Sequence, residues 1–378
     1  MCASSLCATA RLCEKPHTTS SPGQPPASVR NEWTNPKANI DIKLSSQLSF
    51  LHGSVGKFPL PSPFQTMIVL ITGGAGFIGS HLVEHFQKTA TVRVLDNLRS
   101  GAKKNLERLS HEFIEGTITD RDTVRTAMQG VDFVFHLAAM VSVPESMKNP
   151  TGCVTENVLG TLIVLEESAR AKVRKLCFAS SAAIYGNSPI VPKVETMMPE
   201  PCSPYAITKL DGEFYCAMFQ REGLLETAAL RFFNVFGPRQ DPRGPYAAAV
   251  PIFIKSALAN RQLTIFGDGE QTRDFVSVKD VVAAITHVAS TPGLTGVLNV
   301  AGGGQITIND LAKKIIALTA SESPIVHAPA RDGDVRHSTA SVEKLRATGF
   351  ASGYDFNDAL AATVRAVDAE SRHTDYAH

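Results

Sequence analysis

Residues 67–80 read MIVLITGGAGFIGS, and this run predicts a strand, a glycine-rich turn and the start of a helix. The first five residues are apolar and rich in β-branched side chains, as in a buried strand of a parallel sheet. Gly73 would permit the tight turn, Gly76 would let a pyrophosphate approach the backbone, and Gly79 would let the helix pack against the strand. Because the first N–H groups of such a helix attract an anion, we expect a dinucleotide here, with an ordinary glycine-rich turn as the alternative.

The next predicted strand, residues 91–95, indicates which dinucleotide would bind. It ends at Asp96, about 20 residues after the glycines, where an acidic side chain can hydrogen-bond to the ribose hydroxyls of NAD. NADP would need a basic group at this place, and Arg99 keeps that alternative open. We therefore predict NAD.

The composition of the chain is typical of an enzyme with a folded apolar core. The chain has 378 residues, a net charge of +1 and 43% hydrophobic residues, enough for one large or two modest cores. The near-neutral charge indicates no nucleic-acid or membrane partner, and no apolar run approaches the roughly 18 residues of a membrane span. Of the seven cysteines, Cys2, Cys7 and Cys13 lie in the first stretch, and the other four (Cys153, Cys177, Cys202 and Cys216) show no metal-ligand spacing. We therefore expect reduced thiols, no metal and a cytoplasmic location.

Residues 1–66 differ from the rest of the chain. They are rich in Ser, Thr, Pro and Gln and hold the only tryptophan, Trp33. We expect a disordered tail or an over-extended gene start, because Met67 is itself a candidate first residue. An organelle-targeting peptide is the alternative, since acidic residues are few there.

Strand and helix patterns alternate from Met67 onward. Such alternation predicts an α/β fold, a doubly wound parallel sheet of the Rossmann type spanning residues 67–234. After residue 235 prolines and glycines cluster and the pattern becomes less regular. We expect residues 235–378 to form a smaller mixed α/β domain that binds substrate at the carboxyl edge of the sheet. The predicted strands after the second are residues 112–114, 132–136, 175–178 and 227–230, and one predicted helix is 157–167.

Tyr205 and Lys209 are the candidate catalytic pair. They stand four positions apart in a predicted helix after Pro204, so they share one face. A nearby ammonium group and an oxidised nicotinamide would both lower the pKa of Tyr205, making it a general base for a hydroxyl proton. Ser181, just after the strand 175–178, would hydrogen-bond to the same oxygen, with Ser180 as the competing candidate. The alternative is a surface pair without function.

From Met67 to about Arg372 the chain resembles the nucleotide-sugar 4-epimerases, which are extended short-chain dehydrogenases/reductases. The resemblance rests on TGGAGFIG at 72–79, LDNL at 95–98, HLAA at 136–139, SSAAIYG at 180–186, PYAITK at 204–209, RFFNVFGP at 231–238 and GDGEQTRDFV at 267–276.

The resemblance implies roles for particular residues. A homodimer is implied as well, through the helices that begin near Thr151 and Tyr205. Arg273 and Arg331 would clamp the diphosphate, because a guanidinium group pairs with phosphate through two hydrogen bonds. The implied NAD-binding residues are Gly73, Gly76, Phe77, Ile78, Gly79, Asp96, Asn97, Ala138, Asn157 and Lys209. The implied substrate-binding residues are Ser181, Tyr205, Asn234, Arg273, Arg331 and Asp334.

The resemblance also implies a reaction. Tyr205 would take the proton of the sugar's 4-hydroxyl group while hydride passes to NAD, and the 4-keto intermediate would turn before hydride returns to its opposite face. Related dehydratases and decarboxylases usually carry an acid just after the serine, where this chain has Ala182 and Ala183. The alanines favour simple epimerisation, and the resemblance implies UDP-glucose and UDP-galactose as the substrates. A UDP-glucuronate 4-epimerase, a dehydratase, a reductase or synthase, and a non-catalytic NAD(P)-binding protein remain alternatives.

Three positions bear on the details of binding. Ser338 falls near a place where a bulky aromatic restricts some family members to glucose and galactose, so a small side chain there favours N-acetylated sugars as further substrates. Thr117 stands where the family often has an Asp that meets the adenine amino group, and Asp120 cannot be assumed to replace it. Ser341 also stands where many members have Asp.

Overall fold

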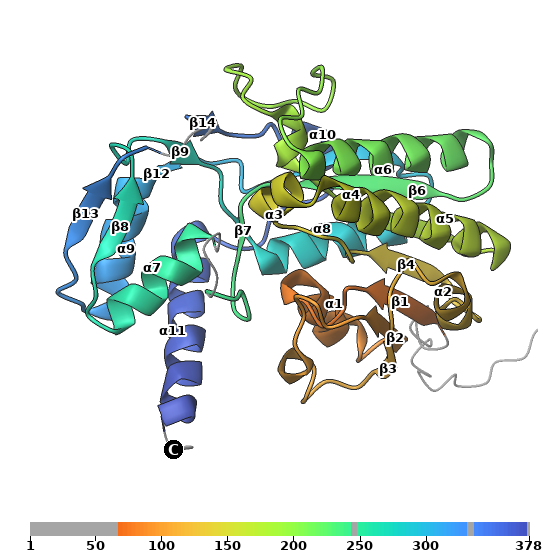
Figure 1. The fold of residues 1–378 in the computed structure, drawn as a ribbon, viewed down its shortest axis with the longest axis horizontal. Helices are drawn as coiled ribbons and strands as arrows, with labels where there is room; N and C mark the ends of the chain where they lie inside the picture. The colour runs from red at the N-terminus through yellow and green to blue at the C-terminus, as the bar shows by residue number, and fades with distance from the viewer. Residues whose placement is uncertain (1–66, 243–247, 331–335, 376–378) are drawn as a thin grey trace, which may run out of the picture. The chain divides into compact units, whose positions relative to one another are not determined.

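The computed structural model describes residues 67–242, 248–330 and 336–375 (Figure 1). Seven parallel strands form its large sheet in the order β11-β6-β5-β4-β1-β2-β3. The strand order reverses between β1 and β4, and ligands of such sheets lie at this switch point beyond the carboxyl ends of the strands. The strands are β1 (Ile68–Thr72), β2 (Thr91–Asp96), β3 (Glu112–Glu115), β4 (Phe133–His136), β5 (Lys175–Ser181), β6 (Thr227–Phe232) and β11 (Gly296–Val300).

Helices cover both faces of this sheet. Alternate strand residues enter two separate apolar cores: Val69 and Ile71 pack with α1 and α8, whereas Leu70 packs with α2, α5 and α6. This two-residue period follows from the pleat of a strand. The helices are α1 (Phe77–Phe86), α2 (Arg121–Ala127), α5 (Gly160–Arg170), α6 (Pro204–Arg221) and α8 (Val278–Ser290), with the short α3 (Val143–Lys148) and α4 (Pro150–Val154) before α5.

A third apolar core lies in the later part of the chain. Three helices and the strand pair β8–β13 enclose it. Short strands connect this part to the large sheet as the pair β7–β10 and the group β12-β9-β14. The elements are β7 (Val235–Phe236), α7 (Ala249–Leu258), β8 (Leu263–Phe266), β9 (Thr272–Arg273), β10 (Val276–Ser277), β12 (Ile306–Thr307), α9 (Ile308–Thr319), β13 (Ile325–Ala328), β14 (His337–Ser338), α10 (Glu343–Arg346) and α11 (Phe356–Asp375).

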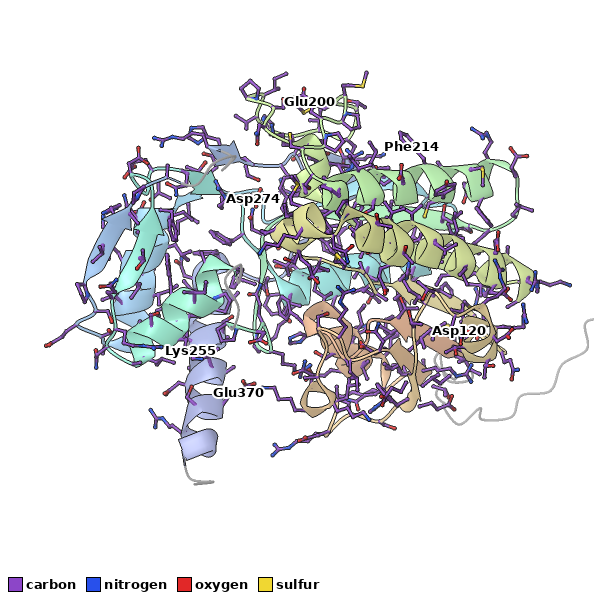
Figure 2. The ribbon with its side chains drawn as sticks, in the orientation of Figure 1. Asp120, Glu200, Phe214, Lys255, Asp274 and Glu370 are labelled. Carbon is purple, nitrogen blue, oxygen red and sulfur yellow. The ribbon has the colours of Figure 1, made fainter. Side chains whose placement is uncertain are left out.

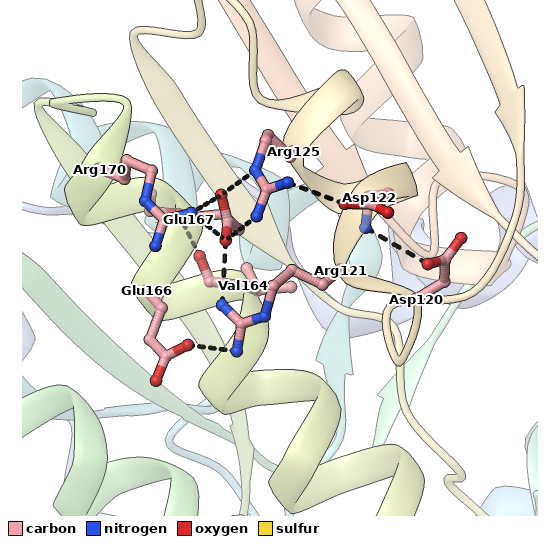
Figure 3. Close-up of polar contacts among 9 residues, drawn as sticks. Asp120, Arg121, Asp122, Arg125, Val164, Glu166, Glu167 and Arg170 are labelled. Carbon is pink, nitrogen blue, oxygen red and sulfur yellow. Dashed lines mark hydrogen bonds and ion pairs between the residues drawn. The ribbon is translucent and has the colours of Figure 1, made fainter.

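Glu167 of α5 is a carboxylate buried beneath three arginine side chains (Figure 3). It accepts hydrogen bonds from Arg121 and Arg170 at 3.0 Å and from Arg125 at 3.2 Å. Burial acts to raise the pKa of Glu167, but the bonds from Arg121 and Arg125 outweigh it and leave the pKa lowered. Because Arg121 and Arg125 belong to α2, this cluster ties α2 to α5 at the outer face of the sheet.

The predicted fold class is confirmed: the sheet is parallel and doubly wound, and each predicted strand is present. The predicted helix over 157–167 is part of a longer helical stretch, in which a π-helical turn at Thr155–Leu159 joins α4 to α5. The expectations for residues 1–66 lie outside the described residues. The division of the chain at residue 234 stays a prediction, and both α8 and β11 return to the large sheet after it. Among the helices that the structure describes, none combines the length and apolar character of a membrane span.

Candidate functional site

Gly73 and Gly79 pack so closely against the neighbouring backbone that a side chain is excluded at both positions. Gly73 has a φ of +73°, and a Cβ there would lie 2.7 Å from the backbone nitrogen of Ala138. A Cβ on Gly79 would overlap the carbonyl oxygen of Gly73. Gly76 is the N-cap residue of α1 and supplies no capping side chain, so the first turn of this helix keeps its N–H groups available to an anion.

A first cavity, of about 460 Å³, begins at this turn and follows the carboxyl ends of the strands. Its wall includes Phe77 and Ile78 from α1 and Ala138 from the end of β4. Thr117 does not line it, although both neighbours of Thr117 do. The Thr117 hydroxyl contacts that of Thr119 at 2.9 Å. Asp120 is the N-cap of α2 and does not line the first cavity either.

Asp96 lies on the wall of the first cavity at the end of β2. Its carboxylate accepts hydrogen bonds from the backbone of Ala75 at 2.9 Å and of Leu98 at 2.7 Å. Burial raises the pKa of Asp96, and these two bonds oppose the shift. Asn97 and Arg99 lie on the same wall, and the guanidinium group of Arg99 is paired with Glu145 at 2.6 Å.

Tyr205 and Lys209 occupy one face of α6, as predicted from their spacing. Lys209 is buried, donates to the carbonyl oxygen of Ala179 at 2.8 Å, and lies 5.8 Å from the centre of the Tyr205 ring. Burial lowers the pKa of Lys209 to about 8. The ammonium group thus stands beside the phenol ring at the carboxyl end of β5.

The expected lowering of the Tyr205 pKa is wrong for the protein by itself. The ring keeps some contact with solvent, but desolvation of the phenolate by the surrounding protein raises its pKa, and a hydrogen bond with Ser181 only partly opposes this. The reason for the error is that the sequence shows the neighbouring ammonium group but not the burial of the phenol. The structure favours Ser181 over Ser180, because the Ser180 hydroxyl instead donates to Glu213.

A second cavity, of about 830 Å³, meets the first at the reactive side chains. Ser181, Tyr205 and Asn234 line both cavities. Arg273 and Ser338 line the second cavity, and so do Ala182 and Ala183. Tyr205 and Ser181 therefore face two spaces, one leading to the glycine-rich turn and one leading to Arg273.

Of the predicted site residues that the structure describes, Asn157 does not line either cavity. Asn157 is buried behind the first cavity, where its amide accepts from Met140 N at 2.7 Å and donates to Met140 O at 3.0 Å and to Thr208 at 3.0 Å. It thus fixes the backbone at Met140, which does line the cavity. Arg331 and Asp334 lie outside the described residues, so their roles stay predictions.

Sequence reasoning missed two charged groups next to the site. Glu213 stands four positions after Lys209 on the same face of α6 and pairs with Arg231 of β6. The spacing Tyr205-Lys209-Glu213 was an available signal for the first of these. Lys193, the other group, lines the second cavity and carries no sequence signal beyond its charge.

The comparisons with known proteins agree with this geometry. A family model described as the NAD dependent epimerase/dehydratase family matches residues 69–301. The UDP-glucose 4-epimerase of Mycolicibacterium smegmatis is 39% identical over 288 residues, which are 74% of this chain and 91% of the relative. The UDP-N-acetyl-α-D-glucosaminuronate decarboxylase of Bacillus cytotoxicus is 36% identical over 269 residues, 69% of this chain and 83% of the relative.

A solved structure is similar over nearly the whole described chain. It is the UDP-N-acetylglucosamine 4-epimerase from Methanobrevibacter ruminantium in complex with UDP-N-acetylmuramic acid. It aligns with a TM-score of 0.79 at 37% sequence identity, covering 81% of this chain and 100% of that chain.

Proposed function

The chain belongs to the NAD dependent epimerase/dehydratase family, and from this premise we propose that it catalyses the NAD-dependent 4-epimerisation of a UDP-hexose. One observation carries the proposal: Tyr205 and Ser181 line both cavities at the point where the cavities meet. A group held in one cavity and a sugar held in the other would both reach the same phenol. A reaction in which hydride leaves a carbon and a proton leaves the hydroxyl group on that carbon requires this arrangement.

The residues of the first cavity fit NAD. The glycine-rich turn leaves space against the start of α1 for a pyrophosphate, and Asp96 and Asn97 offer acceptors for ribose hydroxyl groups. The carboxylate of Asp96 would repel a 2′-phosphate, and Arg99 on the same wall is already paired with Glu145, so this wall favours NAD over NADP. When bound, NAD supplies an acceptor for hydride from C4 of the sugar and later returns it.

The protein's own side chains would handle the proton and the position of the sugar. Tyr205 takes the proton of the 4-hydroxyl group as a general base, and Ser181 hydrogen-bonds to the same oxygen. Lys209 stabilises the tyrosinate through its positive charge beside the ring. Asn234 and Arg273 hold the nucleotide sugar, with Arg273 pairing the diphosphate.

The residues after Ser181 favour epimerisation over elimination. Ala182 and Ala183 line the second cavity and carry no group that exchanges a proton, whereas loss of water or carbon dioxide needs an acid or base near the leaving group. Decarboxylases exist among the relatives of similar identity, so a related UDP-sugar lyase is the second candidate.

The substrate proposal is UDP-glucose and UDP-galactose, with the N-acetylated sugars as further candidates because Ser338 leaves room in the second cavity. We also propose a homodimer formed through α6 and the helical stretch before it. The cytoplasmic location stays a prediction.

The test is NMR of the purified protein with UDP-galactose and, separately, with UDP-N-acetylglucosamine, without added NAD. Appearance of the 4-epimer, lost in Tyr205→Phe, supports the proposal and names the sugar. No product after addition of NAD counts against the proposal for these sugars, and UDP-glucuronate would be tested next.

A further inference from the structure

Three lysines are almost fully buried in the described part of the chain, namely Lys175, Lys193 and Lys209. Lys209 belongs to the site above. Lys175 is fully partnered, because its ammonium group donates to the carbonyl oxygens of Val288 and Thr291 at 2.8 Å each and forms an ion pair with Glu226 at 2.8 Å. Lys193 differs from both.

The side chain of Lys193 is 2% exposed, yet no carboxylate of the described residues lies within ion-pair distance of it. Its ammonium group donates to the carbonyl oxygen of Ser188. Burial lowers the pKa of Lys193, and the charge of Glu200 acts in the opposite direction. Glu200 is itself exposed, on the loop above α6 (Figure 2). A buried ammonium without a counter-ion is costly unless another group pairs with it.

The backbone around Lys193 is fixed. Its N–H donates to Thr339 O at 2.8 Å, and its carbonyl oxygen accepts from Ser341 N at 2.8 Å. Two of the residues that contact Lys193 carry unused hydroxyl groups: Ser188 Oγ and Thr339 Oγ1 are buried and have no hydrogen-bond partner within the described structure. The Lys193 ammonium group, whose backbone is fixed, thus belongs to a region in which two buried hydroxyl groups have no hydrogen-bond partner.

Lys193 also lines the second cavity, together with Ser181, Tyr205 and Arg273. We propose that Lys193 is a substrate-binding residue that donates hydrogen bonds to an acyl oxygen on the sugar. That oxygen belongs to either the carbonyl group of an N-acetyl substituent or the carboxylate of a hexuronate. The proposal rests on the proposed function, since it takes the second cavity as the sugar site.

The apolar part of the second cavity would accommodate the methyl group of an N-acetyl substituent. Pro144 and Met147 form part of the wall, against which a methyl group would pack. The positive charge of Lys193 would pair with the carboxylate of a hexuronate. Both groups present an acyl oxygen as the acceptor, and glucose and galactose have hydroxyl oxygens but no acyl oxygen.

Equilibrium binding tests the proposal without turnover. The NAD-loaded Tyr205→Phe protein is titrated by calorimetry with UDP, UDP-galactose, UDP-N-acetylglucosamine and UDP-glucuronate, with and without Lys193→Met. We expect Lys193→Met to weaken binding of one acyl-bearing sugar by about 10-fold or more, the size of a lost hydrogen bond to a charged group. Affinity for UDP and UDP-galactose should change by less than about twofold, within the range of surface effects.

The control is Lys175→Met, which removes an equally buried charge away from the cavity and should not discriminate among the four ligands. An equal loss for all four ligands in Lys193→Met, or no loss for any, overturns the proposal. If Lys193→Met does not fold, the titrations of the Tyr205→Phe protein alone test the proposal. Equal affinity of that protein for UDP-galactose and for both acyl-bearing sugars overturns it. Failure of the wild type to epimerise any sugar would count against the proposed function but leaves these binding ratios interpretable.

Discussion

Arg231 and Glu213 form an ion pair inside the protein, with a nitrogen–oxygen distance of 2.7 Å and only 4% of each side chain exposed. The pair joins β6 to α6, and it is part of a larger network. The Ser180 hydroxyl donates to Glu213, and Arg231 donates to the Tyr185 hydroxyl at 2.8 Å. Because Ser180 precedes Ser181 and Glu213 shares a helix face with Tyr205, the network supports both sides of the candidate site.

We predict that Glu213→Gln destabilises the protein by roughly 3 kcal/mol, because it leaves the Arg231 charge buried without its counter-ion. Urea denaturation of wild type and variant measures this loss. We also expect kcat to fall by a larger factor than KM rises. The reason is that Glu213 helps to position Ser181 and Tyr205 but does not itself line the second cavity.

The matched control is Glu213→Leu combined with Arg231→Met, which removes both charges. Replacing a buried pair by apolar groups is often close to neutral, so the double variant should be more stable than Glu213→Gln. If the single variant unfolds at the same urea concentration as the wild type, the ion pair does not contribute as argued.

The sequence predicted those features that depend on local pattern. The turn at Gly73 and the strands that follow it were predictable because alternation and glycine spacing act over a few residues. The position of Tyr205 and Lys209 on one face followed from helix geometry in the same way.

Features that depend on long-range pairing were not predictable. Residues 296–300 form a short strand, and nothing local indicates that it joins the edge of the large sheet beside β6. The partner of Arg231 lies 18 residues away on another element, so the ion pair exists only once α6 packs on the sheet. The raised pKa of Tyr205 in the protein without NAD was not predictable for the same reason, because burial is a property of the folded chain.

Gly79→Ala should abolish NAD binding while leaving most of the fold intact. The added methyl group would overlap Gly73 O and lie 2.7 Å from Gly74 Cα, so α1 must move away from the turn that would hold the pyrophosphate. Equilibrium dialysis or calorimetry with NAD measures the loss, which we expect to exceed about 100-fold, or about 2.7 kcal/mol.

Gly353→Ala is the control for this substitution, because a Cβ at Gly353 meets nothing within 4 Å. It should bind NAD as the wild type does. Unchanged NAD affinity in Gly79→Ala would mean that close packing at this turn is not what forms the site.

His136 makes the stability of the protein dependent on pH. It is 1% exposed, its ring nitrogens contact Thr72 Oγ1 at 2.7 Å and Thr161 Oγ1 at 3.0 Å, and burial lowers its pKa to about 3. In the unfolded chain the pKa returns to 6.5, so between pH 6.5 and about 3 only the unfolded state takes up the proton. Stability contributed by neutral His136 is therefore present above pH 6.5 and is lost as the pH falls, by about 1.4 kcal/mol per pH unit.

Urea denaturation at several pH values checks this in wild type and in His136→Gln. The variant lacks the titrating ring, so its free energy of unfolding should fall less steeply below pH 6.5 than that of the wild type, whatever its stability at neutral pH. Parallel curves for the two proteins would show that His136 does not have a depressed pKa.

Phe214→Asp should dissociate the proposed homodimer. Phe214 projects from α6 and is 63% exposed, and Ile207, seven residues before it, is 47% exposed (Figure 2). On the helical stretch before α6, Val154 and Leu159 are 49% and 48% exposed. Exposed apolar side chains on neighbouring helices indicate an interaction surface, and a large aromatic among them is the type of residue that dominates binding energy.

Analytical ultracentrifugation of the full chain measures the dissociation constant. We expect Phe214→Asp to raise it by about 30-fold or more, equivalent to about 2 kcal/mol, since the variant both removes the aromatic contact and buries a charge. Leu318→Asp is the matched control, because Leu318 is 43% exposed on α9, in the later part of the chain. A wild type that sediments as a monomer, or equal weakening by both substitutions, would mean that the exposed face of α6 does not hold a second copy of this chain.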